Sequence, residues 1–196
     1  MGYCCRLCKQ LARPQAVFVH PNQTTVAASN RTCVATSIWI DYIGAMDIYD
    51  EFTSLLKSLN AHRAVYAVCG GFAVAFHGYV RATKVIDLLV RSFEVDQIVS
   101  IAAKCGFDAN DGFLRFEIGT ERETTIKRLN KFVGREFLTL DLILVNAETE
   151  YAWNSRLEVE LPDQHMQVVS RSGLALMKRL AGRTQDILDL EKLGLK

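Results

Sequence analysis

The chain has 196 residues and a mass of 22.0 kDa, which suits one domain, or one domain with a small appendage, and excludes two large domains. Hydrophobic residues make up 49% and charged residues 23%, so neither wholesale disorder nor a fibrous rod fits. The formal net charge of +1 provides no general electrostatic field for nucleic acid or an anionic membrane. Any such partner must be held locally.

No apolar run approaches the roughly 18 to 20 residues that cross a bilayer, so we expect no membrane partner. The N-terminus lacks the basic region, the continuous apolar region and the small-residue cleavage site of a secretory signal. We therefore expect a cytoplasmic protein whose cysteines are thiols.

Residues 1–45 differ in composition from the rest of the chain. They hold four of the six cysteines and carry a net charge of +3, against −2 for residues 46–196. No apolar periodicity persists within them, so we expect a poorly ordered extension followed by one domain over residues 46–196. One hypothesis is that natural translation begins at Met46. The Cys5-x-x-Cys8 pair has no second half that would complete a zinc site.

The domain opens with a predicted helix, strand and second helix. Residues 47–60 carry an acidic first turn and then apolar side chains at helical spacing, namely Phe52, Leu55, Leu56 and Leu59. Residues 64–69 are a short apolar strand that ends at Gly70 and Gly71, where the next helix can begin.

The remaining segments alternate between strand and helix patterns. Ser92 is a candidate N-cap for a helix through Lys104, and Ser170 for a helix through Ala181. The other expected strands are 86–90, 113–118, 124–129, 137–145 and 167–169, and the other expected helices are 147–153 and 184–193. This alternation predicts an α+β domain of the α/β-sandwich type, with a mixed sheet flanked by helices.

A glycine pair between a strand and a helix lets the backbone approach an anion such as phosphate. Gly70 and Gly71 alone are equally compatible with a simple tight turn. The sequence that begins at this pair is a more specific signal than the glycines alone. It reads GGFAVAFHGYVRATKVIDLLV, and FLTLDLILV follows some fifty residues later.

These motifs resemble the nucleotidyltransferase superfamily, which has the fold of the DNA polymerase beta catalytic core. The segments GGFAVAFHGYVRAT, IDLLV and MKRLAGRTQDILDLEKL are similar to the bacterial AbiEii-type toxin nucleotidyltransferases and related small proteins. The resemblance covers about residues 47–193. It implies transfer of a nucleoside monophosphate from a Mg²⁺-bound or Mn²⁺-bound nucleoside triphosphate to a hydroxyl group on RNA, protein or a small molecule.

The resemblance also implies roles for individual residues. Gly70 and Gly71 would cradle phosphate, Asp87 would bind metal, and Asp141 would bind metal or act as a base. The family has two carboxylates at i and i+2 of one strand, which point to the same face and can share two metal ions roughly 3.5–4 Å apart. Val85 stands where the first of these carboxylates is expected. Its loss would cost on the order of a thousandfold or more in rate.

Further candidates lie near the motifs. Arg81, Thr83 and Lys84 precede the metal strand and could face phosphate, or be solvated loop residues. Lys178 could help to hold nucleotide, or lie on a solvated helix face.

Three other residues are better explained by structural roles. Asp186 and Asp189 are spaced i and i+3, which favours a surface or salt-bridge role. We expect His77 to make a structural hydrogen bond or to cap its helix.

Two functional hypotheses follow. The first is a metal-dependent nucleotidyltransferase, impaired by Val85, with a nucleoside triphosphate as substrate. The second is a catalytically inactive member that binds nucleotide weakly, or binds a cognate antitoxin or toxin as part of a toxin–antitoxin pair. Val85 favours the second hypothesis.

Overall fold

The computed structural model describes residues 47–120 and 123–195. The helices are α2 (Ile48–Ala61), α3 (Gly70–Phe76), the 3₁₀ helix η1 (Ser92–Glu94), α4 (Val95–Lys104), α5 (Glu150–Asn154), α6 (Arg171–Ala181) and α7 (Thr184–Lys192). The strands are β1 (Ala67–Val68), β2 (Val85–Val90), β3 (Ala109–Phe116), β4 (Thr124–Val133), β5 (Glu136–Leu144), β6 (Leu157–Leu161) and β7 (Gln164–Val168). The expected extension over residues 1–45 lies outside the described residues.

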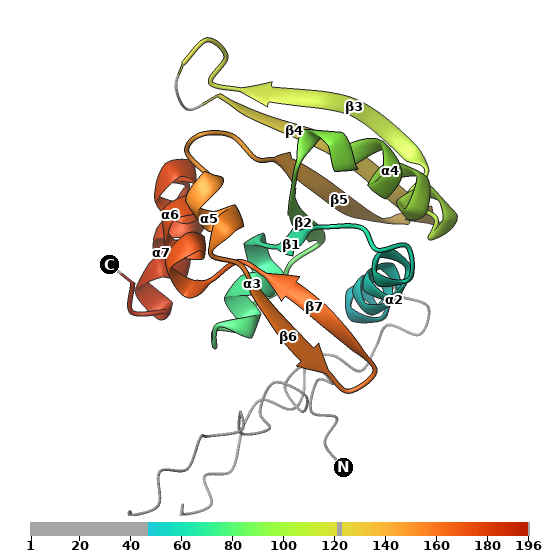
Figure 1. The fold of residues 1–196 in the computed structure, drawn as a ribbon, viewed down its shortest axis with the longest axis horizontal. Helices are drawn as coiled ribbons and strands as arrows, with labels where there is room; N and C mark the ends of the chain where they lie inside the picture. Colours follow the sequence, from blue (N-terminus) through green and yellow to red (C-terminus); the bar gives the residue numbers. More distant parts are fainter. Residues whose placement is uncertain (1–46, 121–122, 196) are drawn as a thin grey trace, which may run out of the picture. The chain divides into compact units, whose positions relative to one another are not determined.

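The strands form one mixed sheet in the order β3-β4-β5-β2-β1-β7-β6 (Figure 1). The pairs β2–β5 and β1–β7 are parallel, and the other neighbours are antiparallel. The predicted α+β class with a mixed sheet and C-terminal helices is therefore confirmed. The order places β2 beside β5, although the whole β3–β4 hairpin separates them in sequence.

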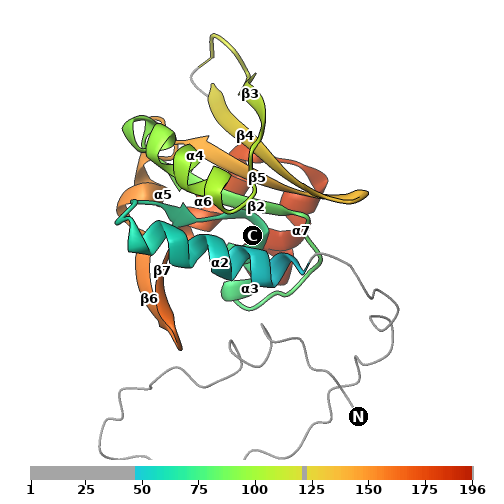
Figure 2. The same ribbon diagram turned by 90° about the vertical axis from the view of Figure 1, so that its right-hand side faces the viewer.

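Two groups of helices lie on opposite sides of β1 and β2 in Figure 1. Helices α2 and α4 pack against one another, and the turned view in Figure 2 has both of them toward the viewer. Helices α5, α6 and α7 pack in succession and form the second group. No helix within the described ranges combines the length and the apolar character that crossing a bilayer requires.

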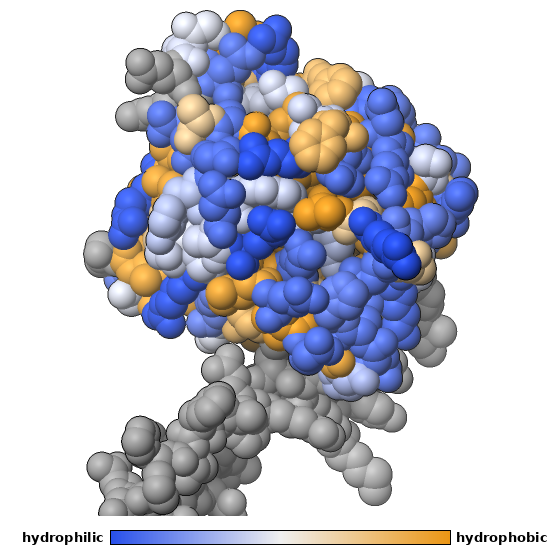
Figure 3. Space-filling model, in the orientation of Figure 1, coloured by the Kyte–Doolittle hydropathy of each residue, from blue (hydrophilic) through white to orange (hydrophobic). Residues whose placement is uncertain are grey.

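The first predicted helix forms as expected. The Asp47 side chain accepts a hydrogen bond from the Tyr49 backbone N–H, which caps α2. Its four predicted apolar side chains are buried, and Phe52 stacks on Phe72 of α3 with ring centroids 4.0 Å apart. This stack holds α2 against α3, the helix that begins at the glycine turn. On the face of the molecule seen in Figure 3, the described residues are mostly hydrophilic, with apolar residues scattered among them.

The structure differs from the sequence predictions at two places. Ser92 is the first residue of the single turn η1 and does not cap α4, which begins only at Val95 and has no side-chain cap. The Glu94 carboxylate accepts from the Val65 N–H at 3.4 Å. Strand β6 was not predicted; its side chains are mostly exposed and it pairs only with β7 at the sheet edge. Ser170 does cap α6 as predicted, through the Gly173 N–H at 3.0 Å.

Candidate functional site

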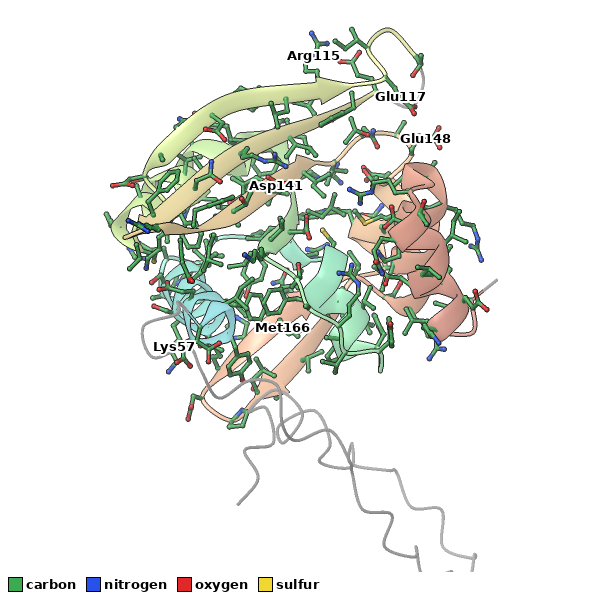
Figure 4. All side chains as sticks on the ribbon, turned by 180° about the vertical axis from the view of Figure 1, so that it is seen from behind. Lys57, Arg115, Glu117, Asp141, Glu148 and Met166 are labelled. Atoms are coloured by element: carbon green, nitrogen blue, oxygen red, sulfur yellow. The ribbon has the colours of Figure 1, made fainter. Side chains whose placement is uncertain are left out.

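Asp87 and Asp141 lie opposite each other on neighbouring parallel strands. In the register of β2 with β5, Asp87 pairs with Asp141 and Val85 pairs with Thr139. Because alternate residues of a strand point to the same face, all four side chains share one face of the sheet. Figure 4 labels Asp141 in the middle of the molecule, far from Arg115 at the hairpin tip. The two acids singled out by the sequence are thus brought together.

The glycine turn packs directly against Asp87. Gly70 has φ +56°, and a Cβ at this position would lie 1.9 Å from Asp87 Oδ2, so only glycine fits. The Cys69 N–H donates to the Asp87 carbonyl at 2.9 Å, and the Gly71 N–H acts to lower the pKa of the Asp87 carboxylate. The diglycine is therefore more than a generic tight turn, because it allows an acid to approach the backbone closely.

The surroundings of Asp87 disfavour its ionised form. Burial, and after it the negative charge of Asp141, raise the pKa of Asp87 to about 6, although the charge of Arg183, the Gly71 N–H and the charge of Lys178 act in the opposite direction. Asp141 contributes to this shift because it lies directly opposite Asp87 on the neighbouring strand. Burial and the neighbouring carboxylate therefore outweigh the influences that favour ionised Asp87.

Arg128 of β4 is a site residue that the sequence analysis missed. It pairs in register with Asp141 and donates from Nε and Nη2 to the two carboxylate oxygens at 2.8 and 2.7 Å. This bidentate geometry is the strong form of an arginine–carboxylate pair. In the sequence, TIKRLN is only one more strand, and the position of Arg128 beside Asp141 depends on the β4–β5 register.

The row of the sheet that contains Val85 is polar but lacks a carboxylate next to Val85. Thr139 donates from its hydroxyl to Asn130 Oδ1 at 2.9 Å, and Asn130 Nδ2 donates to Asp111 at 2.6 Å. Asp111 belongs to β3, three strands away from β2 in the sheet order. It cannot stand in for the missing acid at position 85.

Two of the predicted phosphate-binding cations are engaged elsewhere. Lys178 is buried, and its Nζ lies 2.9 Å from Asp186 and 2.7 Å from Asp189. Arg81 donates from Nε and Nη2 to Asp189 at 2.8 and 3.0 Å. The salt-bridge role expected for Asp186 and Asp189 is confirmed, but both acids are buried. The alternative of a solvated face for Lys178 is wrong, because α7 covers it.

The remaining predicted residues occupy the turn before β2 and the end of α3. The Thr83 hydroxyl bonds to the Val85 backbone at 3.2 Å and touches the space beside Gly71, and Lys84 is exposed. His77 occupies the C-cap of α3, and its Nε2 lies 2.9 Å from the Val169 carbonyl, as predicted for a structural role.

The side chains present do not fit the two-metal arrangement that the resemblance implies. Among the described residues, no group of three or more His, Cys, Asp or Glu side chains could hold a metal ion. Asp87 and Asp141 are two carboxylates, and Arg128 occupies both oxygens of Asp141. Magnesium ions at this site stay a prediction from the sequence.

Comparison of the sequence with family models and with curated proteins finds no match. The fold does match solved structures. The protein TM1012 of Thermotoga maritima, assigned as a nucleotidyltransferase, has a TM-score of 0.51 at 13% identity, over 74% of this chain and 91% of that one. The antibiotic-resistance factor ANT(2'')-Ia has a TM-score of 0.51 at 14% identity, over 76% of this chain and 84% of that one. The chain therefore has a nucleotidyltransferase-like fold.

Proposed function

We propose that the protein binds a nucleoside triphosphate on the sheet face that carries Asp87 and Asp141, and that its capacity to transfer a nucleoside monophosphate is impaired. The observation that carries this proposal is the register of β2 with β5, which aligns Asp87 with Asp141 but Val85 with Thr139. This register supports the proposal because two of the expected acids lie side by side, and it supports impairment because the third position is apolar. The nucleotidyltransferase-like fold supports the same ligand class.

Two features support impaired transfer. Valine offers no oxygen to a cation or a substrate hydroxyl, and Arg128 engages both oxygens of Asp141, the candidate general base. A base must be free to accept a proton within hydrogen-bond distance of the acceptor. Gly70 and Gly71 border Asp87, as expected of a turn next to the phosphates.

The experiment compares the natural chain with Val85→Asp. Binding of ATP, GTP, CTP and UTP is measured by titration calorimetry. Transfer of label from the α-position is then measured with Mg²⁺ or Mn²⁺, using tRNA and the protein itself as acceptors. We expect binding by both proteins, and transfer by Val85→Asp on the order of a thousandfold faster than by the natural chain.

Val80→Asp is the matched control, because it adds the same charge to an exposed loop residue outside the site. It should leave transfer unchanged. Failure of the natural chain to bind any of the four nucleotides contradicts the proposal. Transfer by the natural chain as fast as by Val85→Asp contradicts the impairment.

Finer assignments stay predictions from the sequence: the AbiEii-type relationship, a bacterial toxin–antitoxin role with a cognate partner, an RNA or protein acceptor, and a cytoplasmic location. Purification of the chain from its native host with a stoichiometric partner would test the toxin–antitoxin assignment.

A further inference from the structure

Two guanidinium groups near the acid pair are more accessible than the other cations of the site. The side chain of Arg128 is 34% exposed and that of Arg183 is 77% exposed. Lys178 is 5% exposed and buried among its two acid partners. An incoming anion can therefore reach Arg128 and Arg183 without opening the packing of α6 on α7.

Each of these guanidinium groups has N–H donors that its ion pair does not use. Arg128 uses Nε and Nη2 on Asp141, and Arg183 uses Nε and Nη2 on Asp186, with the Nε contact at 2.7 Å. Within residues 47–120 and 123–195, neither Nη1 has a hydrogen-bond partner. Because a guanidinium has five N–H donors, each arginine can stay paired with its carboxylate and still donate to a phosphate oxygen.

The two arginines come from separate elements, but the charges of Asp87 and Asp141 affect the pKa of both. Arg128 lies on β4, and Arg183 is the residue before α7. The hydrogen bond to Asp186, and then the charges of Asp186, Asp87 and Asp141, raise the pKa of Arg183. Asp87 and Asp141 likewise contribute to raising the pKa of Arg128, after the Asp141 hydrogen bond. Both cations are thus within electrostatic reach of the acid pair.

The charges of this cluster balance without an added ion. The carboxylates are Asp87, Asp141, Asp186 and Asp189, and the cations are Arg81, Arg128, Lys178 and Arg183. A site with a third carboxylate beside Asp87 would repel a polyphosphate unless metal ions accompanied it. Val85 removes that carboxylate, and Arg128 neutralises Asp141.

We propose that Arg128 and Arg183 together bind the polyphosphate of a nucleotide, and that this binding needs no divalent cation. This inference rests on the proposed function and specifies its ligand chemistry. The two guanidinium groups supply the positive charge that metal ions would otherwise supply to the polyphosphate.

The test measures the affinity of the full chain for ATP and for inorganic triphosphate, in EDTA and in excess Mg²⁺. We expect the two conditions to agree within about threefold for the natural chain. Arg183→Gln should weaken binding about tenfold or more in EDTA, because a charge-assisted hydrogen bond contributes roughly 1.5–3 kcal/mol. Arg115→Gln, on the distant hairpin tip, is the matched control and should leave affinity unchanged.

Asp141 provides the sharpest discrimination. Asp141→Asn releases Arg128 toward the phosphates, so binding should be at least as tight as in the natural chain both in EDTA and in excess Mg²⁺. If Asp141 were instead a metal ligand, the variant would bind more weakly in excess Mg²⁺. The double variant Arg128→Gln with Asp141→Asn removes both members of this ion pair, so neither is left without its partner, and it should bind about tenfold more weakly than Asp141→Asn alone.

Three outcomes would overturn this inference. Binding that EDTA abolishes overturns this inference and leaves the proposed function standing. Binding in EDTA that neither arginine variant weakens also overturns it. Absence of nucleotide binding in both conditions overturns the proposed function as well.

Discussion

Two carboxylate pairs in this protein, Asp186 with Asp189 on α7 and Asp87 with Asp141 on the sheet, are compensated to different degrees. The α7 pair has three cations at hydrogen-bond distance: Arg81, Lys178 and Arg183. Within the part of the chain that the structure describes, the sheet pair has one, Arg128, which contacts Asp141 and not Asp87.

The pKa shifts of Asp186 and Asp189 have the opposite direction to the pKa shift of Asp87. Despite burial, hydrogen bonds from Arg183 and Lys178 lower the pKa of Asp186, and hydrogen bonds from Arg81 and Lys178 lower that of Asp189. Burial and Asp141 raise the pKa of Asp87 instead. The α7 pair therefore stabilises the fold, whereas burial and the neighbouring carboxylate disfavour the ionised form of Asp87.

The largest expected effect is on the α7 pair. Lys178→Met removes a cation that two buried acids share, and should lower the free energy of unfolding by about 3–5 kcal/mol, measured by urea denaturation. Lys192→Met, at an exposed position in the last turn of α7, should change it by less than about 0.5 kcal/mol. Equal losses in the two variants would contradict a structural role for the buried pair.

The next effect concerns the glycine turn. Gly70→Ala should destabilise the protein by about 2–4 kcal/mol, because its Cβ would lie 1.9 Å from Asp87 Oδ2 in addition to the strain of φ +56°. Gly134→Ala is the matched control: its φ is +62° and no atom lies within 4 Å of the added Cβ. It should cost only about 1 kcal/mol. If the two variants lose stability equally, the close approach of Asp87 is not what requires glycine.

The smallest effect has the opposite sign. Asp87→Asn removes a charge that the fold disfavours, and should raise the free energy of unfolding at pH 7 by about 1–2 kcal/mol. The pKa of Asp87 is raised from 3.8 to about 6, so its ionisation destabilises the protein above pH 6 and has no such effect below about pH 4. The gain should therefore vanish as pH falls through this window.

Asp163→Asn, at an exposed position, is the control for the pH series and should give a difference close to zero throughout. Destabilisation by Asp87→Asn at pH 7 would place Asp87 in the same structural class as Asp186 and Asp189.

The helices and the buried strands could be predicted from local patterns. Spacing of apolar residues locates α2, and capping by Ser170 locates α6, because both signals act within a few residues. The alternation of strands and helices also indicated the α+β class. Strand β6 carries little apolar signal, since it is an exposed edge strand.

The site was only half predictable for a related reason. Asp87 and Asp141 belong to motifs, whereas Arg128 becomes part of the site only through the register of β4 with β5. The burial of Lys178 likewise depends on how α7 packs on α6, which one helix in isolation cannot indicate. Contacts between distant segments were the part that the sequence left open.

The position of β2 beside β5 also bears on how the protein folds. The chain leaves β2, builds α4 and the β3–β4 hairpin, and only then returns to align Asp141 with Asp87. Closing so long a loop is entropically unfavourable until the intervening hairpin supplies a partner strand, and pairings of this kind slow folding. The sheet face that carries Asp87 and Asp141 is thus expected to assemble late, after the local hairpin and helices, so that an incompletely folded chain lacks the site proposed above.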